Sequence, residues 1–333
     1  MVSNNTVPLA ILATYLLTCL VLTIRCITII RSSNTPSQQR GLVVTQSHKK
    51  TRKITLFSIL AIVSLATTWT YMLSYFRWSY FDWADTHNPA ALSSDELYLG
   101  EWLRDTSLFQ QAWFSALESK ERSWWTLQIF GFCAVWSLSL SVQGRKRNIP
   151  KVWCFMLLGQ IVAISFASNL FFLAVLLHDE QSVPQPSTTN KSRTGETTSS
   201  RWWLFTSDSI ILLANLAFVA VLVTGDMGTA WFLPALLAPH ILAFVPILRD
   251  SFSSSTASSP ASHAGRIKDV PRLVQFSVFV AVLAAATSQL PAERANLAAL
   301  LQTLYEHPAV SSVGWDVICC WVSYTAWAFF GNQ

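Results

Sequence analysis

Long, unbroken blocks of apolar residues are the feature that most constrains this chain. A helix needs roughly 20 apolar residues to cross the hydrocarbon of a bilayer, and the blocks at 7–31 and 54–76 meet that requirement. Hydrophobic residues make up 52% of the 333 residues and charged residues only 12%, whereas soluble domains carry about 25% charged residues. The sequence therefore predicts an all-α polytopic membrane protein, with a single transmembrane helical domain over residues 1–333.

The apolar blocks predict about eight transmembrane helices. Three prolines interrupt the sixth block, which is tolerated where neighbouring helices satisfy the freed backbone groups. Two segments, 178–202 and 249–269, contain runs rich in Ser, Thr and Pro and are predicted to be flexible loops. The predicted spans are 7–31, 54–76, 123–142, 152–177, 203–224, 230–248, 270–290 and 309–331.

Clusters of Lys and Arg predict the orientation of the first spans. The loops at 32–53 and 143–151 are short and strongly basic, so we expect them to be cytosolic and the N-terminus to be lumenal. Two glycosylation sequons, at Asn4 and Asn190, agree with this orientation and with an endoplasmic reticulum membrane. Basic residues in the 249–272 loop disagree with simple alternation, so the orientation of the last four spans stays open.

Composition also argues against several classes of protein. All six cysteines fall inside apolar blocks, which favours packing residues over a disulfide framework. The net charge of +5 is concentrated in short loops and is interpreted as a topology signal, so no nucleic-acid partner is predicted. The sequence contains no metal-ligand spacing and no Gly-rich dinucleotide motif. We therefore predict neither a metal nor a cofactor.

The longest loop, 77–122, is predicted to hold an amphipathic interfacial helix. A 3.6-residue apolar periodicity runs over about 95–118, and Ser93 or Ser94 is suitably placed to cap its start. One face collects Leu and aromatic residues, so this helix is expected to lie on the membrane or dip into it.

Two carboxylates lie at the margin of that apolar face. Glu101 and Asp105 are one helical turn apart, so their side chains are expected to be neighbours. Desolvation and mutual repulsion would raise their pKa values. The alternatives are a solvated helix edge, or neutralisation of the pair by Arg104 or Arg122.

The predicted topology places several polar and aromatic residues at the lumenal level. Asp208 is a third acidic candidate near the start of the fifth span, while His240 and Asp316 lie inside the sixth and eighth spans. For the amides, hydrogen bonding between helices is the alternative role. The predicted substrate-binding residues are Trp102, Trp113, Trp124, Trp125, Gln128 and Asn169.

Such a site combines ring faces that stabilise cations with carboxylic acids that donate protons. That combination suits acid-initiated carbocation chemistry on a lipid-like polyene. It suits a binding site for an amphipathic amine or a lipid equally well.

Three stretches carry a resemblance to a known family: Gly-Glu-Trp-Leu-Arg-Asp-Thr-Ser-Leu-Phe at 100–109, Gln-Ala-Trp at 111–113 and Arg-Ser-Trp-Trp-Thr-Leu-Gln-Ile-Phe at 122–130. With the basic third loop and Asn-Leu-Phe-Phe at 169–172, the chain resembles a fungal family of polytopic membrane proteins. That family includes the membrane-bound terpene cyclases of meroterpenoid biosynthesis, of the ascofuranone and macrophorin type.

The resemblance implies cyclisation of a prenylated aromatic compound, or of its terminal epoxide, without loss of diphosphate. The chain has no Asp-rich motif that would hold magnesium for diphosphate ionisation, which fits that chemistry. From local reasoning, Glu101 and Asp105 are the predicted catalytic acids and Asp208 is the third candidate. The alternatives are a transporter or lipid-binding protein, and a membrane protein without chemistry. Paired repeats and helices broken at mid-membrane are more typical of a transporter.

Overall fold

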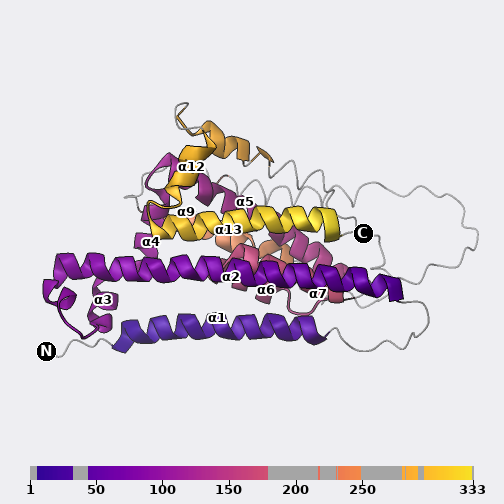
Figure 1. Ribbon diagram of the computed structural model, residues 1–333, viewed down its shortest axis with the longest axis horizontal. Coiled ribbons are helices and arrows are strands. Elements are labelled where there is room, and N and C mark those ends of the chain that lie inside the picture. The colour runs from indigo at the N-terminus through magenta and orange to yellow at the C-terminus, as the bar shows by residue number, and fades with distance from the viewer. Residues whose placement is uncertain are drawn as a thin grey trace, which may run out of the picture.

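The computed structural model describes residues 6–32, 44–178, 217, 230, 232–248, 280–281, 283–291 and 296–331. Within these ranges the chain is helical and forms no β-strand, which confirms the predicted all-α class (Figure 1). The helices are α1 (Thr6–Ser32), α2 (Val44–His87), η1 (Pro89–Leu92), α3 (Leu99–Asp105), α4 (Leu108–Leu117), α5 (Lys120–Lys146), α6 (Trp153–Ile161), α7 (Ile164–Leu177), α9 (Phe232–Leu242), α12 (Leu297–Thr303), α13 (Pro308–Ala326) and η2 (Trp327–Gly331).

Four helices are long and apolar enough to cross a membrane. They coincide with the first, second, third and eighth predicted spans, and run over Thr6–Ser32, His48–His87, Lys120–Lys146 and Pro308–Gly331. The total of eight spans is not confirmed. The fourth predicted span is divided between α6 and α7, and the sixth contains a shorter apolar helix, Phe232–Leu248. Most of 203–224, part of 270–290 and nearly all of the predicted flexible loops lie outside the described residues.

Helix α5 lies at the centre of the bundle and α1 at its edge. In the most apolar stretch of α5, 89% of the residues are buried, against 11% in α1. The axes of α1, α2 and α13 run along the same direction in Figure 1, and α13 packs against α2, α5 and α7. The exposed side of α1 carries large aliphatic residues such as Ile11, Leu17 and Leu20, as expected for a surface that faces lipid.

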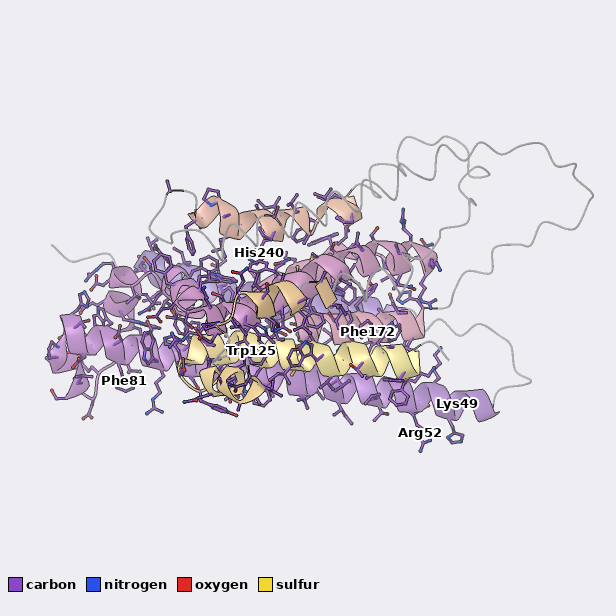
Figure 2. All side chains as sticks on the ribbon, turned by 90° about the horizontal axis from the view of Figure 1, so that it is seen from above. Lys49, Arg52, Phe81, Trp125, Phe172 and His240 are labelled. Carbon is purple, nitrogen blue, oxygen red and sulfur yellow. The ribbon has the colours of Figure 1, made fainter. Side chains whose placement is uncertain are left out.

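The two basic segments lie at the same end of the bundle. Figure 2 shows Lys49 and Arg52 at the start of α2 at one end and Phe81 at the other. The basic 143–151 turn is placed by Cys154, which follows it and lies close to Cys26. Cys26 is in the last turns of α1, and α1 ends at the same end of the bundle as Lys49 and Arg52. This arrangement is what the positive-inside rule requires if that end is cytosolic.

The structure corrects the predicted interfacial helix at 95–118. The segment predicted as one helix consists of two helices, α3 and α4. They are separated at Thr106, whose backbone is extended (φ −111°, ψ 142°). The Thr106 hydroxyl donates to the Trp102 carbonyl (2.6 Å) and closes the end of α3. Ser94 accepts the Glu96 N–H (3.0 Å) within a turn and does not cap a helix.

Packing explains why one straight helix is not formed there. Both helices contact α2, but α3 also contacts α1, whereas α4 also contacts α5 and α13. The chain must therefore turn between two different surfaces. The first part of the predicted loop, 77–87, belongs to the long helix α2.

Candidate functional site

A break in the fourth predicted span organises the interior of the bundle. Ala163 has an extended backbone (φ −168°, ψ 135°), so α6 ends and α7 begins in the middle of an apolar block. The freed N–H groups of Ile164 and Ser165 donate to the two carboxylate oxygens of Asp316, each at 2.9 Å. Because an unpaired backbone group in an apolar interior is costly, the Asp316 side chain of α13 stabilises the start of α7.

The other side of the break is stabilised by α1. The Tyr15 hydroxyl donates to the Ile161 carbonyl at 2.8 Å, which satisfies an acceptor at the end of α6. Two residues earlier, Gly159 allows α6 to lie against the fully buried ring of Trp136. A Cβ atom at position 159 would lie 2.5 Å from that ring, so only glycine fits without a shift.

A cavity of about 130 Å³ lies beside the break. The ring of Trp113 on α4 and the ring of Phe130 on α5 form part of its wall, and Asp316 and His240 both line it. The buried hydroxyl of Thr68 also lines the cavity, and its oxygen has no hydrogen-bond partner within the described residues. An apolar cavity of roughly 150 Å³ holds a benzene-sized molecule, so this one suits a single ring or one isoprene unit.

His240 is held in a defined orientation on α9 (Figure 2). Its Nδ1 is hydrogen-bonded to Oε1 of Gln160, and Gln160 Nε2 donates to the Cys133 sulfur at 2.9 Å. With Oε1 of Gln160 facing the ring as an acceptor, the matching neutral tautomer has its proton on Nδ1 and its lone pair on Nε2. The imidazole also lies edge-on to Phe130 and Trp113, with centroids 5.2 and 6.0 Å apart.

The cavity thus combines three kinds of group. It has an oriented carboxyl group, an imidazole held by a hydrogen bond at Nδ1, and aromatic rings whose faces stabilise positive charge. An acid and a base around an apolar space can add a proton to one atom of a bound molecule and remove a proton from another.

The predicted catalytic pair does not line this cavity. Glu101 and Asp105 lie on α3, and Asp105 forms an ion pair with Arg104 (Nε–Oδ1 2.8 Å) and accepts a hydrogen bond from Trp83 Nε1 (3.3 Å). The Arg104 guanidinium lowers the pKa of Asp105 below its ordinary value. The predicted rise of that pKa is wrong because a cation, and not the apolar margin, dominates its surroundings. The alternative, neutralisation by Arg104, is confirmed for Asp105.

The predicted tryptophans are divided among three places. Trp102 packs with Tyr80 and Trp83 in a cluster near the end of α2. Trp113 lines the cavity. Trp124 and Trp125 pack edge-to-face in the main core, where their N–H groups donate to Thr287 and Thr303 at 3.2 and 3.0 Å. A single aromatic pocket that contains all four tryptophans is therefore wrong.

The two predicted amides are buried polar residues within the bundle. Asn169 Nδ2 donates to Ser323 Oγ at 2.8 Å and to Ser64 Oγ at 3.4 Å, and so ties α7 to α13 and α2. This confirms the alternative of interhelical hydrogen bonding. Gln128 donates within its own helix, to the Trp124 carbonyl at 3.3 Å. Asp208, Asn4 and Asn190 lie outside the described residues.

Comparison of the chain with models of known protein families, with curated proteins and with solved structures finds no match. Within the described part of the chain, no group of three or more His, Cys, Asp or Glu residues could hold a metal ion. The candidate site is therefore described from its own geometry.

Two residues of this site are recognisable in the sequence. Asp316 and His240 are ionisable residues inside apolar blocks, and such residues indicate a functional site. Gln160 and Thr68 carried no comparable signal.

Proposed function

We propose that this chain is a multi-pass enzyme of the endoplasmic reticulum membrane that cyclises an isoprenoid-bearing lipophilic substrate in the cavity beside the α6–α7 break. One observation carries the proposal: Asp316 and His240 line the same aromatic-walled cavity inside a helical bundle. The resemblance to membrane-bound terpene cyclases points to the same chemistry. The cavity volume of about 130 Å³ suits the reacting end of such a substrate.

The proposed reaction is an isomerisation that begins and ends with a proton transfer. The carboxyl group of Asp316 protonates the terminal alkene carbon or the epoxide oxygen, which leaves a cation at the substituted carbon. The π electrons of the next double bond then form the new carbon–carbon bond. His240 Nε2 removes a proton from the carbon beside the final cation, and a new double bond forms. The substrate gains one proton and loses one, and the proton taken up by His240 returns to the Asp316 carboxylate before the next turnover, so no cofactor is consumed.

Local geometry supports these roles. Two backbone N–H groups fix the orientation of the Asp316 carboxyl group, so its position relative to the cavity does not depend on the substrate. The bond from Nδ1 to Gln160 leaves Nε2 of His240 as the basic atom. The rings of Trp113 and Phe130 stabilise the cation, and the Thr68 hydroxyl offers a hydrogen bond to a substrate oxygen.

A second function, intramembrane binding or transport of a small cation or lipid, is favoured by the broken helix. Helices broken within the membrane, with a charged side chain at the break, are typical of transporter binding sites. The α6–α7 break and its Asp316 partner have that form. In this case the carboxylate would bind the ligand and no new bond would form.

Conversion of a substrate distinguishes the two functions. The full chain is expressed in microsomes and supplied with an epoxyfarnesyl phenol, and products are separated and identified by NMR because cyclisation leaves the mass unchanged. We expect the wild type to form a cyclic product and Asp316→Asn and His240→Phe to lose about 100-fold or more of that activity. Binding of the phenol without conversion would favour the second function.

Variants at the sequence-predicted positions provide the control. Glu101→Gln and Asp105→Asn should retain activity, since neither residue lines the cavity. If these two variants lose activity while Asp316→Asn keeps it, the catalytic acid lies on α3 and the cavity assignment is wrong. Each variant is first checked for wild-type abundance in the membrane and for its unfolding temperature.

A further inference from the structure

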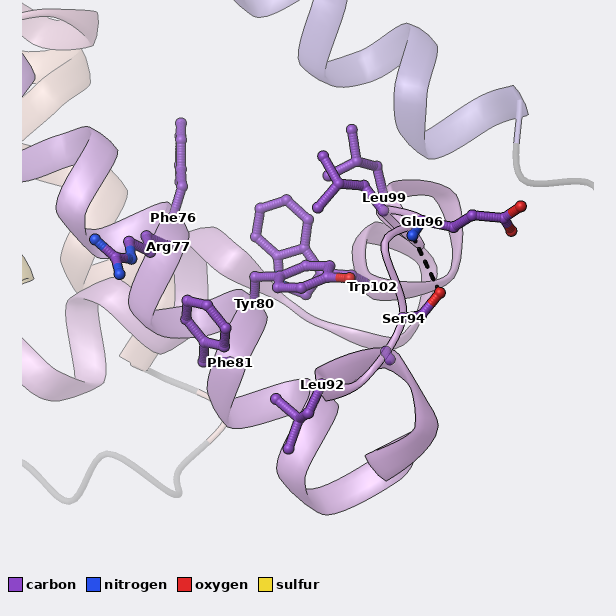
Figure 3. A pocket seen from close by; sticks show the side chains of 11 residues that line it. Phe76, Arg77, Tyr80, Phe81, Leu92, Ser94, Glu96, Leu99 and Trp102 are labelled. Atoms are coloured by element: carbon purple, nitrogen blue, oxygen red, sulfur yellow. Dashed lines mark hydrogen bonds between the residues drawn. The ribbon is translucent and has the colours of Figure 1, made fainter.

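A second, larger cavity lies far from the break, at the end of α2 where η1 and α3 fold back against it (Figure 3). Its volume is about 500 Å³. Four aromatic side chains line it, namely Phe76, Tyr80, Phe81 and Trp102, and Leu92 and Leu99 add aliphatic surface. We call this cavity the α2 groove. It shares no lining residue with the cavity beside the break.

The α2 groove begins where the membrane-spanning part of α2 is predicted to end. The second predicted span stops at Phe76, and the groove is lined from Phe76 onward. Helix α2 has 44 residues, which is about 66 Å of helix, and roughly 30 Å of this is enough to cross the hydrocarbon. Its last turns therefore extend past the hydrocarbon, and the groove opens at the level of the lipid headgroups.

The floor of the groove is suited to an apolar ligand. Trp102 and Tyr80 are buried, and their polar atoms already have partners: Trp102 Nε1 donates to Ser79 Oγ (3.2 Å), and the Tyr80 hydroxyl accepts the Tyr98 N–H (3.3 Å). What remains for a ligand is ring surface and the O–H donor of Tyr80. Around the floor, Phe81, Leu92 and Leu97 are 47%, 46% and 72% exposed. Covering this surface with a hydrocarbon chain would be favourable by about 25 cal/mol per Å².

A single cation lies at one end of the groove. Arg77 is exposed, lies over the Phe81 ring (5.6 Å to the centroid) and forms no ion pair with any described carboxylate. In Figure 3 the Glu96 carboxylate lies at the opposite end and points away from Arg77. A guanidinium group without an internal anion, at headgroup level, matches the charge and geometry of a phosphate.

We propose that the α2 groove binds one membrane phospholipid, with its phosphate at Arg77 and an acyl chain across the ring surfaces of Tyr80 and Trp102. The bound lipid covers the exposed apolar side chains of η1 and α3 and holds the end of α2 at the membrane surface. The site is independent of the proposed catalysis, because it lies on different helices and requires no reaction.

Native mass spectrometry of the full-length, delipidated protein tests this proposal. The protein is titrated with phosphatidylglycerol, with diacylglycerol of the same chains, and with inorganic phosphate. We expect saturable binding of one phosphatidylglycerol, and binding about tenfold weaker for diacylglycerol and for the variant Arg77→Gln, the scale of one charge-assisted contact. Phosphate alone should not bind measurably, since it lacks the chain. The matched control Arg52→Gln, at the opposite end of α2, should bind as the wild type does.

Photolabelling locates the lipid even if a variant folds poorly. A phosphatidylglycerol with a photoreactive group in its acyl chain should label peptides within 76–102 of the wild-type protein. The proposal would be overturned if Arg77→Gln bound phosphatidylglycerol as tightly as the wild type does. It would also be overturned if Arg52→Gln weakened binding as much as Arg77→Gln does, or if labelling were confined to other segments. Tight binding of inorganic phosphate would instead identify an anion site without a lipid.

Discussion

Replacement of Asp316 by alanine tests whether one side chain holds the broken helix in place. The change removes both acceptors of the Ile164 and Ser165 N–H groups, each of which lies 2.9 Å from a carboxylate oxygen. A buried N–H group without a partner costs about 1–3 kcal/mol, so two cost about 2–6 kcal/mol. Removing the carboxyl group also removes its own desolvation cost, which places our expectation near the lower end, at about 2–3 kcal/mol.

The loss is measured as a shift in thermal unfolding in detergent. Every cysteine except Cys319 is buried, so a thiol-reactive fluorogenic dye reports unfolding directly. At about 2.1 cal/mol/K of unfolding entropy per residue, a destabilisation of about 2–3 kcal/mol should lower the unfolding midpoint by roughly 3–4 °C for a chain of 333 residues. Ser312→Ala is the matched control, because Ser312 lies on the same helix but makes only a long contact (3.5 Å) to the Thr68 carbonyl.

Hydrogen exchange separates the local effect from a general one. In Asp316→Ala the amides at 164 and 165 should exchange faster than those in the middle of α7, because only the first turn loses its acceptor. The exchange rates at 164 and 165 in Asp316→Asn should lie between those of the wild type and Asp316→Ala. The asparagine amide keeps one oxygen acceptor but turns an N–H donor toward the other backbone N–H. If Asp316→Ala unfolds at the wild-type temperature and its exchange at 164–165 is unchanged, Asp316 does not hold the break.

Three further predictions test other parts of the structure. Gly159→Ala should destabilise the protein by about 1–3 kcal/mol because the added Cβ meets the Trp136 ring at 2.5 Å, and Trp136→Phe in the same chain should restore part of the loss in thermal unfolding. Burial lowers the pKa of His307, whose Nδ1 accepts the Ala309 N–H and caps α13. The stability contributed by neutral His307 is complete above its unfolded pKa of about 6.5 and is lost as the pH falls below that value. His307→Asn caps the helix without titrating, so it should flatten the decline in unfolding temperature between about pH 7 and pH 5. An unchanged decline would show that other groups cause it. In sealed microsomes, a protease site inserted near residue 90 should be protected and one inserted within 143–151 should be cleaved, and the reverse pattern would invert the predicted topology.

The long helices were predictable because each carries its own signal. A block of apolar residues identifies a possible span without reference to any other part of the chain, and α1, α2, α5 and α13 all contain such blocks. The helix at 95–118 was predicted in the right region but as one element. Periodicity reports which residues are apolar, and α3 and α4 are both amphipathic. The periodicity does not show that α3 packs against α1 while α4 packs against α5 and α13, and this difference requires the turn at Thr106.

The candidate site was less predictable because its parts come from separate helices. Asp105 and Glu101 are close in sequence, so a local pattern draws attention to them, but the nearest cation, Arg104, is equally local and removes the expected pKa shift. Trp113 alone of the predicted ligand-binding residues lines the cavity beside the break. Its neighbours there, His240 and Asp316, are more than a hundred residues away in the chain. Nothing in a local window indicates that these residues meet.

The break in α6–α7 still leaves a trace in the sequence, although not at the break itself. Val162 and Ala163 are neither proline nor glycine, so no local breaker predicts it. The trace is Asp316, an acidic residue in a predicted span that contains no Lys or Arg. A carboxyl group buried among apolar helices needs hydrogen-bond donors, and the interior of a continuous helix offers none from its backbone, because every N–H is already bonded. An unpaired acid in one span therefore implies either a polar side chain or an open helix end in another. Here the open end is the start of α7, where Ile164 and Ser165 supply the two donors.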